Sequence, residues 1–391
     1  MASLPWSQQL SDTLAERQRA GRYRKLRTRS SEQGIHVIIE GEKFLSFCSN
    51  DYLGLANHPE IKRAFINAID EQGVGSGAAH LLTGHSYYHQ QLEEALAEFT
   101  GQEKALLFSS GYQANMGVID GLMTRDDVVI QDKLNHASLL DGGRLSAAKQ
   151  LRYQHADISA LEERMAQSQQ ANHRLIVSDG VFSMDGDLAP LNDLVRLAKI
   201  QGAGLFIDDA HAFGVIGERG AGSVEHWDIE QQDRPIVMGT FGKAFGTAGA
   251  FVAADEVVIE TLIQQARTYV YTTAQPAALA AATLQSLKLV QQESWRRDKL
   301  SSLIAQFRQG AQGLGLALLA SDTAIQPIVI GDDKKAIEVG KALEQQGLLV
   351  GVIRPPTVPE GSTRLRITLS ADHCEVDIVE LLTALETLLC T

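Results

Sequence analysis

LFIDDAHAFG, residues 205–214, carries the strongest indication of how this chain folds. Its first residues are apolar on both faces and end in Asp208, which is typical of a buried parallel strand whose carboxyl end carries function. LIVSD, residues 175–179, has the same character. Between 51 and 280, such runs alternate with helical patterns; strands are predicted at 104–108, 127–131, 174–178, 204–208, 235–240 and 249–253. This alternation predicts an α/β fold with helices around a mostly parallel sheet.

The predicted elements divide the chain into three parts. Residues 1–50 should form an N-terminal helical arm and a β-hairpin, and residues 51–280 should form a large domain around the parallel sheet. Residues 281–391 should form a smaller α+β domain, because long helical patterns there accompany a few short strands. The strands of this last part are predicted at 325–330, 348–353 and 364–369, and its final helix at 375–389.

Composition excludes several classes of protein. The chain has 391 residues, 44% of them hydrophobic, so it can bury large cores and is not a disordered chain. The net charge of −13 argues against nucleic acid or an anionic membrane as the main partner. Three cysteines without a CxxC pair predict neither a disulfide framework nor a structural metal site. No apolar run approaches the roughly 18 residues of a membrane span, and a signal peptide pattern is absent, so we expect a cytoplasmic protein.

The N-terminal arm has an unusual concentration of arginine. Six arginines and one lysine fall between Arg17 and Arg29. They could form a solvated surface of the arm. Alternatively, one of them could reach an acidic substrate, because guanidinium groups bind carboxylates through two hydrogen bonds.

The stretch VMGTFGKAFGTAGAF, residues 237–251, surrounds a lysine with small residues. Glycines allow a ligand to approach the backbone closely, and a lysine in a partly desolvated pocket loses charge and becomes nucleophilic. Lys243 is therefore a candidate for covalent binding of a carbonyl compound, and the hydroxyl of Thr240 could bind a phosphate. An ordinary glycine-rich turn is the alternative.

Asp208 and His211 place an acid and an imidazole at the end of one strand. An aspartate in this position could keep a pyridine nitrogen protonated, and the histidine could hold an oxygen of the same ring. A metal site is disfavoured, because no further ligand lies at suitable spacing. An N-cap aspartate beside a surface histidine remains possible.

Three further motifs follow predicted strands. In LFSSGYQAN (107–115), Gly111 and Tyr112 begin a helix whose free N–H groups could hold a phosphate, unless the segment is a plain turn. His136 begins the helix after QDKLN and could stack on a flat cofactor, although a lone histidine is often only a cap. Ser183 lies in the turn GVFSMDGD (180–187).

These motifs, in this order and over almost the whole chain, resemble the α-oxoamine synthases, a branch of the fold-type I pyridoxal-phosphate enzymes. The resemblance also rests on SNDYLGL (49–55), GSG (75–77), IRPPTVP (353–359) and RLRITL (364–369). It implies a large domain that binds pyridoxal 5′-phosphate, with a homodimer as the functional unit. The stretch GSGAAHLLTG (75–84) is less glycine-rich than the family's usual loop.

The resemblance also implies roles for particular residues. Lys243 would bind the cofactor covalently, Asp208 would pair with the pyridine nitrogen, His211 with the ring oxygen, and His136 would stack on the ring. Cofactor binding would be completed by Ser183, Thr240 and the backbone of Gly111 and Tyr112. On the substrate side, the matching positions are Arg24, Asn50, His136, Arg354 and Thr357.

Within the family, IRPPTVP is typical of the branch that serves biotin biosynthesis. This implies decarboxylative condensation of L-alanine with a pimeloyl thioester of coenzyme A or acyl carrier protein. A sister enzyme is the main alternative: a 2-amino-3-ketobutyrate ligase, a 5-aminolevulinate synthase or a long-chain aminoketone synthase. A non-catalytic regulator is disfavoured by the lack of a DNA-binding segment, and a dehydrogenase by the lack of GxGxxG after a first strand.

Overall fold

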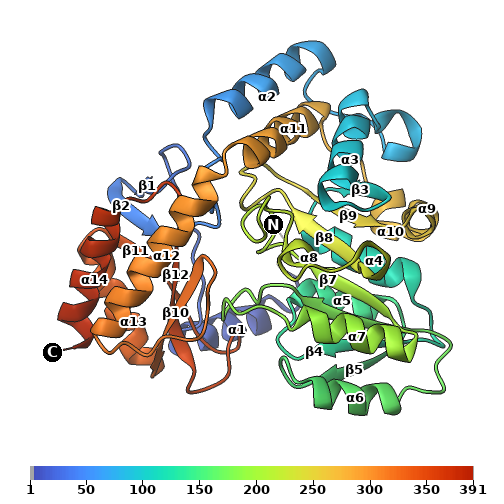
Figure 1. Cartoon of the computed structure of the whole chain (residues 1–391). Helices are drawn as coiled ribbons and strands as arrows, with labels where there is room; N and C mark the ends of the chain where they lie inside the picture. The colour runs from blue at the N-terminus through green and yellow to red at the C-terminus, as the bar shows by residue number, and fades with distance from the viewer. Residues whose placement is uncertain (1–3, 391) are drawn as a thin grey trace.

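The computed structural model describes residues 4–390, which form two sheets with helices around them. In Figure 1 the larger sheet lies on the right, and the smaller sheet lies on the left with the C-terminal helices beside it. This arrangement is the predicted α/β fold.

The large sheet has seven strands in the order β3-β9-β8-β7-β6-β4-β5. β5, β4, β6, β7 and β8 pair in parallel, whereas β9 is antiparallel to both of its neighbours. The carboxyl ends of all strands except β9 therefore meet at one edge. The bounds are β3 Lys104–Phe108, β4 Val128–Asp132, β5 Lys149–Tyr153, β6 Arg174–Asp179, β7 Gly204–Asp208, β8 Ile236–Thr240 and β9 Ala250–Ala254.

Helices cover both faces of this sheet, which explains why its inner strands carry apolar residues on both sides. Along β7, Phe206 packs into one core with α4 and α9, whereas Leu205 and Ile207 pack into another with α6 and α7. The helices of this part are α2 Pro59–Gln72, the π-helix η1 His80–Gly84, α3 Tyr87–Thr100, α4 Gly111–Leu122, α5 Ala137–Leu145, α6 Ile158–Ala166, α7 Leu191–Gln201, α8 Ser223–His226, the short 3₁₀ helix η2 Gln231–Asp233, α9 Glu256–Gln265, α10 Arg267–Val270 and α11 Ala277–Gln292.

The small sheet combines strands from both ends of the chain. Its order is β1-β2-β11-β12-β10, and β2 pairs in parallel with β11, so the N-terminal hairpin extends the C-terminal sheet. The division of the chain at residues 50 and 280 stays a prediction. The elements are β1 His36–Ile39, β2 Glu42–Phe47, β10 Ile325–Gly331, β11 Leu348–Ile353, β12 Thr363–Thr368, and the helices α12 Trp295–Gly313, α13 Asp333–Gln345 and α14 Glu375–Leu389.

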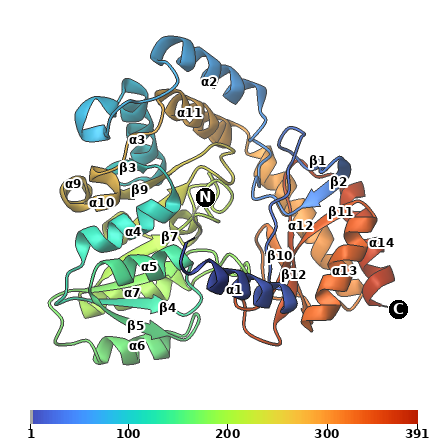
Figure 2. The ribbon, with the colours of Figure 1, turned by 180° about the vertical axis from the view of Figure 1, so that it is seen from behind.

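The arm begins with helix α1, Ser7–Arg19, which has no buried residue. Figure 2 shows α1 in front of the space between the two sheets. The arm is tied to the small sheet, because Arg354 Nη1, just after β11, donates to the carbonyl of Gly21 at 2.7 Å.

Some elements were not predicted, and their composition explains why. β5 has the sequence KQLRY and lies at the edge of the large sheet, where it pairs only with β4 and keeps polar residues. α6 and α9 were also missed. By contrast, β3, β7, β11 and α14 have the predicted bounds.

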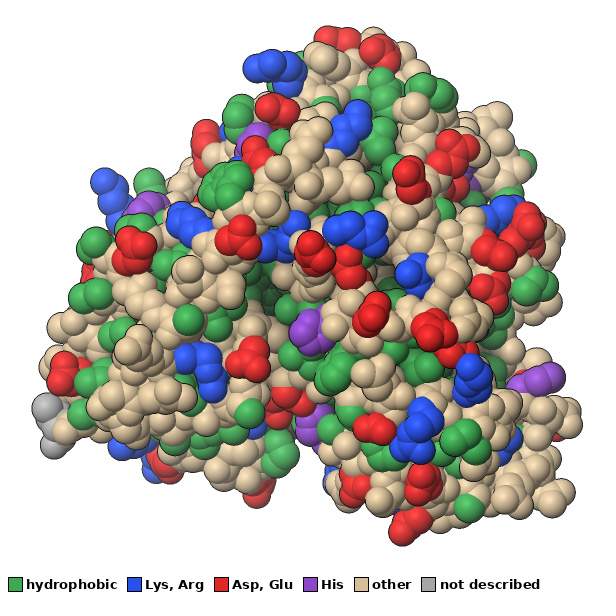
Figure 3. Space-filling model, viewed as in Figure 1, with side chains coloured by type: hydrophobic (Ala, Val, Ile, Leu, Met, Phe, Trp, Pro, Cys, Tyr) green, Lys and Arg blue, Asp and Glu red, His purple; other side chains and the backbone are tan. Residues whose placement is uncertain are grey.

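The surface and the helices agree with the composition. Figure 3 shows Lys and Arg side chains interspersed with Asp and Glu on one face, and a hollow near the middle of that face. Among residues 4–390, no helix combines the length and the apolar character needed to cross a membrane.

Candidate active site

A cavity of about 200 Å³ lies at the carboxyl edge of the large sheet. In doubly wound sheets this edge is the usual place for ligands. The structure brings together there all eight residues predicted to bind the cofactor: Gly111, Tyr112, His136, Ser183, Asp208, His211, Thr240 and Lys243. The remaining lining residues are Asn115, Ser138, Asp179, Ala210 and Met238.

Lys243 reaches the cavity from the loop between β8 and β9. The loop turns back because Gly246 N–H bonds to the carbonyl of Lys243 at 2.9 Å and Gly246 has a φ of 63°. Burial lowers the pKa of Lys243 to about 8, and the charge of Arg366 adds to this effect, whereas Asp208 and Asp179 oppose it. An amine with this pKa is partly unprotonated near neutral pH and can act as a nucleophile or base.

Asp208 is the last residue of β7 and is held by donors on two sides. Asn115 Nδ2 donates to its Oδ2 at 2.6 Å, and the backbone N–H of Ala210 donates to its Oδ1 at 3.0 Å. These two donors fix the orientation of the carboxyl group. Asn115 Oδ1 also lies in this buried region and has no hydrogen-bond partner among the described residues.

Asp179, at the end of β6, positions His136. Its Oδ2 accepts from the backbone N–H of His136 at 3.0 Å, and the histidine ring caps α5 through Ser138. Burial and the neighbouring charge of Asp208 raise the pKa of Asp179 well above its usual range. Burial, with Lys243, lowers the pKa of His136, so this ring is neutral near pH 7.

His211 is held in place by Tyr52. Tyr52 Oη and His211 Nδ1 lie 2.6 Å apart, and the same hydroxyl lies 3.3 Å from Asn50 Oδ1. Burial lowers the pKa of His211 well below its usual range and raises the pKa of Tyr52 to about 12. The pair is therefore uncharged and presents one side of the imidazole to the cavity.

The N-terminus of α4 forms another side of the cavity. Ser110 caps this helix by accepting from Gln113 N–H, and Gly111 is the first helical residue. Free N–H groups at a helix start attract anions. Thr240 lies beside Gly111, since a Cβ on Gly111 would be 3.9 Å from Thr240 Cβ, and its hydroxyl donates to the carbonyl of Gly249 at 2.9 Å.

A buried arginine from the small sheet joins the site at the turn that contains Ser183. Arg366, on β12, donates through Nε to the carbonyl of Ser183 at 2.7 Å and through Nη1 to Thr368 Oγ1 at 2.9 Å. Its Nη atoms also lie 3.4 Å from Asn50 Oδ1. Among the described residues, no carboxylate forms an ion pair with Arg366. The arginine thus keeps a positive charge near Lys243 and His211 that an anionic ligand could neutralise.

The predicted substrate residues other than His136 lie outside this cavity. Within the described chain, Arg24, Asn50, Arg354 and Thr357 do not belong to its lining. Arg24 and Thr357 are exposed, and Arg354 contacts the arm. Asn50 is the nearest to the site, through Tyr52 and Arg366.

Sequence reasoning missed four residues of the site: Asn115, Asp179, Tyr52 and Arg366. All four lie inside motifs that were already prominent in the sequence, namely FSSGYQAN, LIVSD, SNDYLGL and RLRITL. The polar residues in these apolar or glycine-rich segments were the available signal. Their partners come from distant parts of the chain, so the contacts themselves could not be read from spacing.

The chain is similar to known proteins over nearly its whole length. Residues 42–385 match the family described as aminotransferase class I and II. An 8-amino-7-oxononanoate synthase from Nitrosococcus oceani is 57% identical over 372 residues, which are 95% of this chain and 98% of that protein.

Two solved structures extend the similarity to three dimensions. The 8-amino-7-oxononanoate synthase from Francisella tularensis is 32% identical, with a TM-score of 0.77, over 88% of this chain and 97% of that one. A serine palmitoyltransferase from S. paucimobilis, with bound PLP–myriocin aldimine, is 28% identical, with a TM-score of 0.92, over 99% and 98% of the two chains.

Proposed function

The chain belongs to the 8-amino-7-oxononanoate synthases, within the class I and II aminotransferase family, and on this premise we propose how its residues act. It is a pyridoxal-phosphate-dependent acyltransferase of biotin biosynthesis. We assign its substrates as L-alanine and a pimeloyl thioester. The observation that carries the assignment of roles is the convergence of Lys243, Asp208 and His136 on one cavity.

The residues of the cavity fit pyridoxal phosphate. The N-terminus of α4 at Gly111, with Thr240, suits the phosphate, and Asp208 suits a protonated pyridine nitrogen at the opposite end. The buried, unpartnered Oδ1 of Asn115 leaves an acceptor beside Asp208 that a polar ligand could satisfy. Lys243 lies within the same cavity and can bind the aldehyde carbon covalently.

When bound, pyridoxal phosphate supplies an aldehyde for the substrate amine and a ring that accepts the electron pair released at the substrate Cα. The protein supplies the base. Nζ of Lys243 takes the proton from Cα, because burial keeps this amine partly unprotonated near neutral pH. Asp208 would hold the ring nitrogen, and a carboxylate at this position favours the protonated ring.

His136 and His211 orient the flat ring. His136 is fixed at its backbone by Asp179 and at its imidazole by Ser138, so it can offer a rigid face for stacking. In the tautomer of His211 that carries its proton on Nε2, Nδ1 pairs with Tyr52 Oη at 2.6 Å and the Nε2–H would be directed to the phenolic oxygen of the ring. Their lowered pKa values make both imidazoles weaker bases than Lys243, so the lysine is the better proton acceptor.

We assign the carboxylate of L-alanine to Arg366. This guanidinium is buried, has carbonyl and hydroxyl partners but no ion-pair partner among residues 4–390, and bonds to the backbone of Ser183, which lines the cavity. Arg354, which the resemblance implies on the substrate side, lies outside the cavity lining and donates to the carbonyl of Gly21 in the arm.

The acyl donor would enter past the arm. Arg24 is exposed there and free to meet an anionic group, and Thr357 is exposed after β11. We therefore retain Arg24, Arg354 and Thr357 as candidate contacts of the pimeloyl thioester. A homodimer is the proposed functional unit, which sedimentation of the holoenzyme at working concentration would test.

A direct assay distinguishes this assignment from that of a sister enzyme. The purified holoenzyme is given L-alanine, glycine or L-serine with pimeloyl, acetyl, succinyl or palmitoyl thioesters, and thiol and CO₂ release are measured. L-Alanine with pimeloyl thioester should give the highest kcat/KM. A higher kcat/KM for glycine with acetyl or succinyl thioester would overturn the substrate assignment. The same assay with pimeloyl-coenzyme A and with pimeloyl-acyl carrier protein identifies the acyl donor from the higher kcat/KM.

A further inference from the structure

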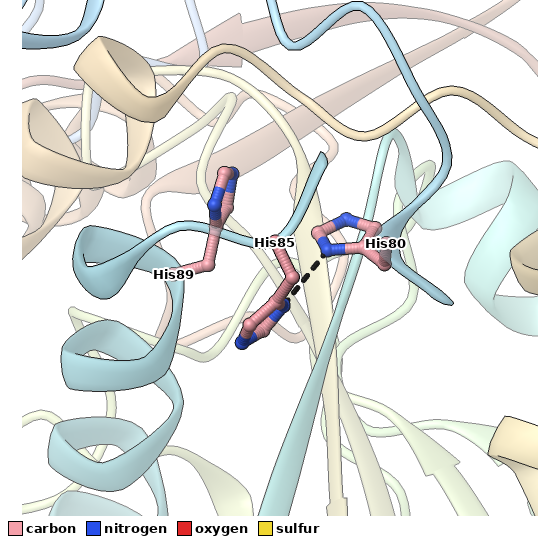
Figure 4. A group of neighbouring side chains, drawn as sticks. All are labelled: His80, His85 and His89. Carbon is pink, nitrogen blue, oxygen red and sulfur yellow. Dashed lines mark hydrogen bonds between the residues drawn. The ribbon is translucent and has the colours of Figure 1, made fainter. Parts of the chain in front are cut away.

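Three histidines gather away from the active site, between the π-helix η1 and the start of α3. His80, His85 and His89 each offer one ring nitrogen, and these three atoms lie within 4.8 Å of one another. Figure 4 shows the three side chains near one another, with a dashed line between His80 Nδ1 and His85 Nδ1, which lie 3.0 Å apart. Their ring centroids are 5.0 to 5.5 Å apart. None of these residues has a role in the proposed reaction.

We propose that His80, His85 and His89 bind one divalent transition-metal ion, with zinc as the best match. Imidazole nitrogens are preferred ligands of zinc, at about 2.0–2.1 Å, and tetrahedral sites with three histidines are well suited to this ion. Magnesium and calcium prefer oxygen ligands and should not compete.

The far sides of two rings are already held as in metal sites. His89 Nε2 lies 2.9 Å from the carbonyl of Gln275, which can only accept, so this nitrogen carries the proton and Nδ1 carries the lone pair. His85 turns Nδ1 toward His80, whereas its Nε2 lies 3.8 Å from a carboxylate oxygen of Glu93. Carboxylates and carbonyls behind ligating histidines fix the tautomer and the orientation of the ring.

An acidic cavity gives access to the cluster. Its volume is about 520 Å³, and it is lined by His80, His85, Lys104 and four glutamates, Glu93, Glu94, Glu103 and Glu260, among other residues. A cation could reach the imidazoles through this cavity.

Metal binding would break the hydrogen bonds that His89 now makes with Ser86. His89 Nδ1 at present accepts from Ser86 N–H at 2.9 Å and lies 2.8 Å from Ser86 Oγ, which forms the capping box of α3. An ion on Nδ1 replaces these bonds, so Ser86 must move. The ion then joins η1 to α3 in place of the capping box.

The test uses the full-length holoenzyme without a histidine tag, dialysed against Zn²⁺ and then analysed for metal content. We expect about one zinc per chain, a zinc-dependent rise in Tm, and nitrogen ligands at about 2.0 Å in X-ray absorption at the zinc edge. His85→Ala, at the more exposed edge of the cluster, should weaken binding at least tenfold and abolish the rise in Tm. His80→Gln should do the same.

His36→Ala is the matched control, because His36 is exposed on β1 and far along the chain from the cluster. It should bind zinc like the wild type. Tm in chelator and cofactor content show that each variant is folded. A wild type that takes up no zinc, or a His85→Ala variant that takes up as much with equal affinity, would overturn the proposal. The latter result would place the zinc elsewhere, for example on the cofactor phosphate.

Discussion

Asp179 and Asp208 stand opposite each other in register at the carboxyl ends of the neighbouring parallel strands β6 and β7. Both carboxyl groups are buried. Burial and then the neighbouring Asp208 raise the pKa of Asp179, and the hydrogen bonds of the two carboxyl groups separate their roles. Asp208 receives two donors and faces the cavity, whereas Asp179 accepts from the backbone of His136 and has a raised pKa.

Replacing Asp208 by Asn should remove the charge that keeps the cofactor ring protonated. We expect kcat to fall by about 100- to 1000-fold, as for the loss of one preorganised electrostatic group. The measurement is product formation from L-alanine and pimeloyl thioester, with visible absorbance confirming bound cofactor. Asp179→Asn is the comparison, because an amide oxygen can still accept from His136, and its effect should stay below about tenfold. Equal effects in the two variants would contradict the assignment.

The pH dependence of cofactor uptake reports on Lys243. Its amine must be unprotonated to attack the aldehyde, and its pKa is lowered to about 8. The uptake rate of the cofactor-free protein should therefore rise with pH to a midpoint near 8. Arg366→Ala should move the midpoint up, because Arg366 lowers this pKa, and Asp208→Asn should move it down. A midpoint above 10 would show an ordinary lysine, and Lys243→Ala should show no covalent uptake at any pH.

Arg366 and its neighbour Arg364 provide a matched pair on one face of β12. Arg364 forms an ion pair with Asp185, whereas Arg366 has no acidic partner among the described residues. Arg366→Ala should raise the KM for L-alanine by roughly 10- to 100-fold, the value of a charge-assisted hydrogen bond, and Arg366→Lys should recover part of the loss. Arg364→Ala should lower Tm and leave this KM nearly unchanged. Steady-state kinetics at saturating thioester separates the two outcomes.

Much of the fold could be predicted because the sequence pattern is direct where strands are buried on both faces. The runs around Phe206 and Ile176 have apolar residues throughout, and their ends in Asp208 and Asp179 mark the functional edge. Where one side of an element meets solvent, the pattern weakens, as in the polar edge strand β5. The pairing of β2 with β11 joins segments about 300 residues apart, and local periodicity contains no information on such a partner.

The site residues that could be predicted are those whose role can be read from a single sequence motif. Lys243, Asp208 and His136 each follow a strand, so topology alone brings them to one edge. Arg366 was missed because the argument for it is that it has no acidic partner among the described residues, and only the folded structure shows which residues surround it. Asn115 was missed for a similar reason: its role is to donate to Asp208, which lies 93 positions further along the chain.

His155 connects Asp132 with the turn after Ser183, and its contribution should depend on pH. Its Nδ1 lies 3.2 Å from Asp132 and its Nε2 2.9 Å from Asp187. Burial lowers its pKa, but the two carboxylates outweigh burial and raise the pKa to about 10. A raised pKa stabilises the fold fully below the unfolded value of about 6.5 and loses this effect as pH rises through 10.

His155→Ala should therefore lower the free energy of unfolding by roughly 1–3 kcal/mol at pH 6, a range reduced for partial exposure of the ring. The difference from wild type should shrink by more than half toward pH 10. Denaturant unfolding of the two proteins across this range is the measurement. A difference that grows with pH would contradict the charged bridge.

Gly246 and Gly242 test whether the lysine loop depends on one close backbone contact. A Cβ on Gly246 would lie 2.3 Å from the backbone nitrogen of Ala56, and its φ of 63° is unfavourable for other residues. That nitrogen donates to Asp51 Oδ2, so a shift would also break a partly buried hydrogen bond. Gly246→Ala should cost roughly 2–5 kcal/mol of stability and reduce cofactor content.

Gly242→Ala is the control in the same loop. Its Cβ would meet no atom closer than 3.9 Å, and its φ is not positive, so stability should change by less than about 0.5 kcal/mol. Thermal unfolding and cofactor absorbance of both variants are compared with wild type. Equal losses in the two would mean that the loop responds to any added side chain, and the contact with Ala56 would then not be what holds Lys243 in place.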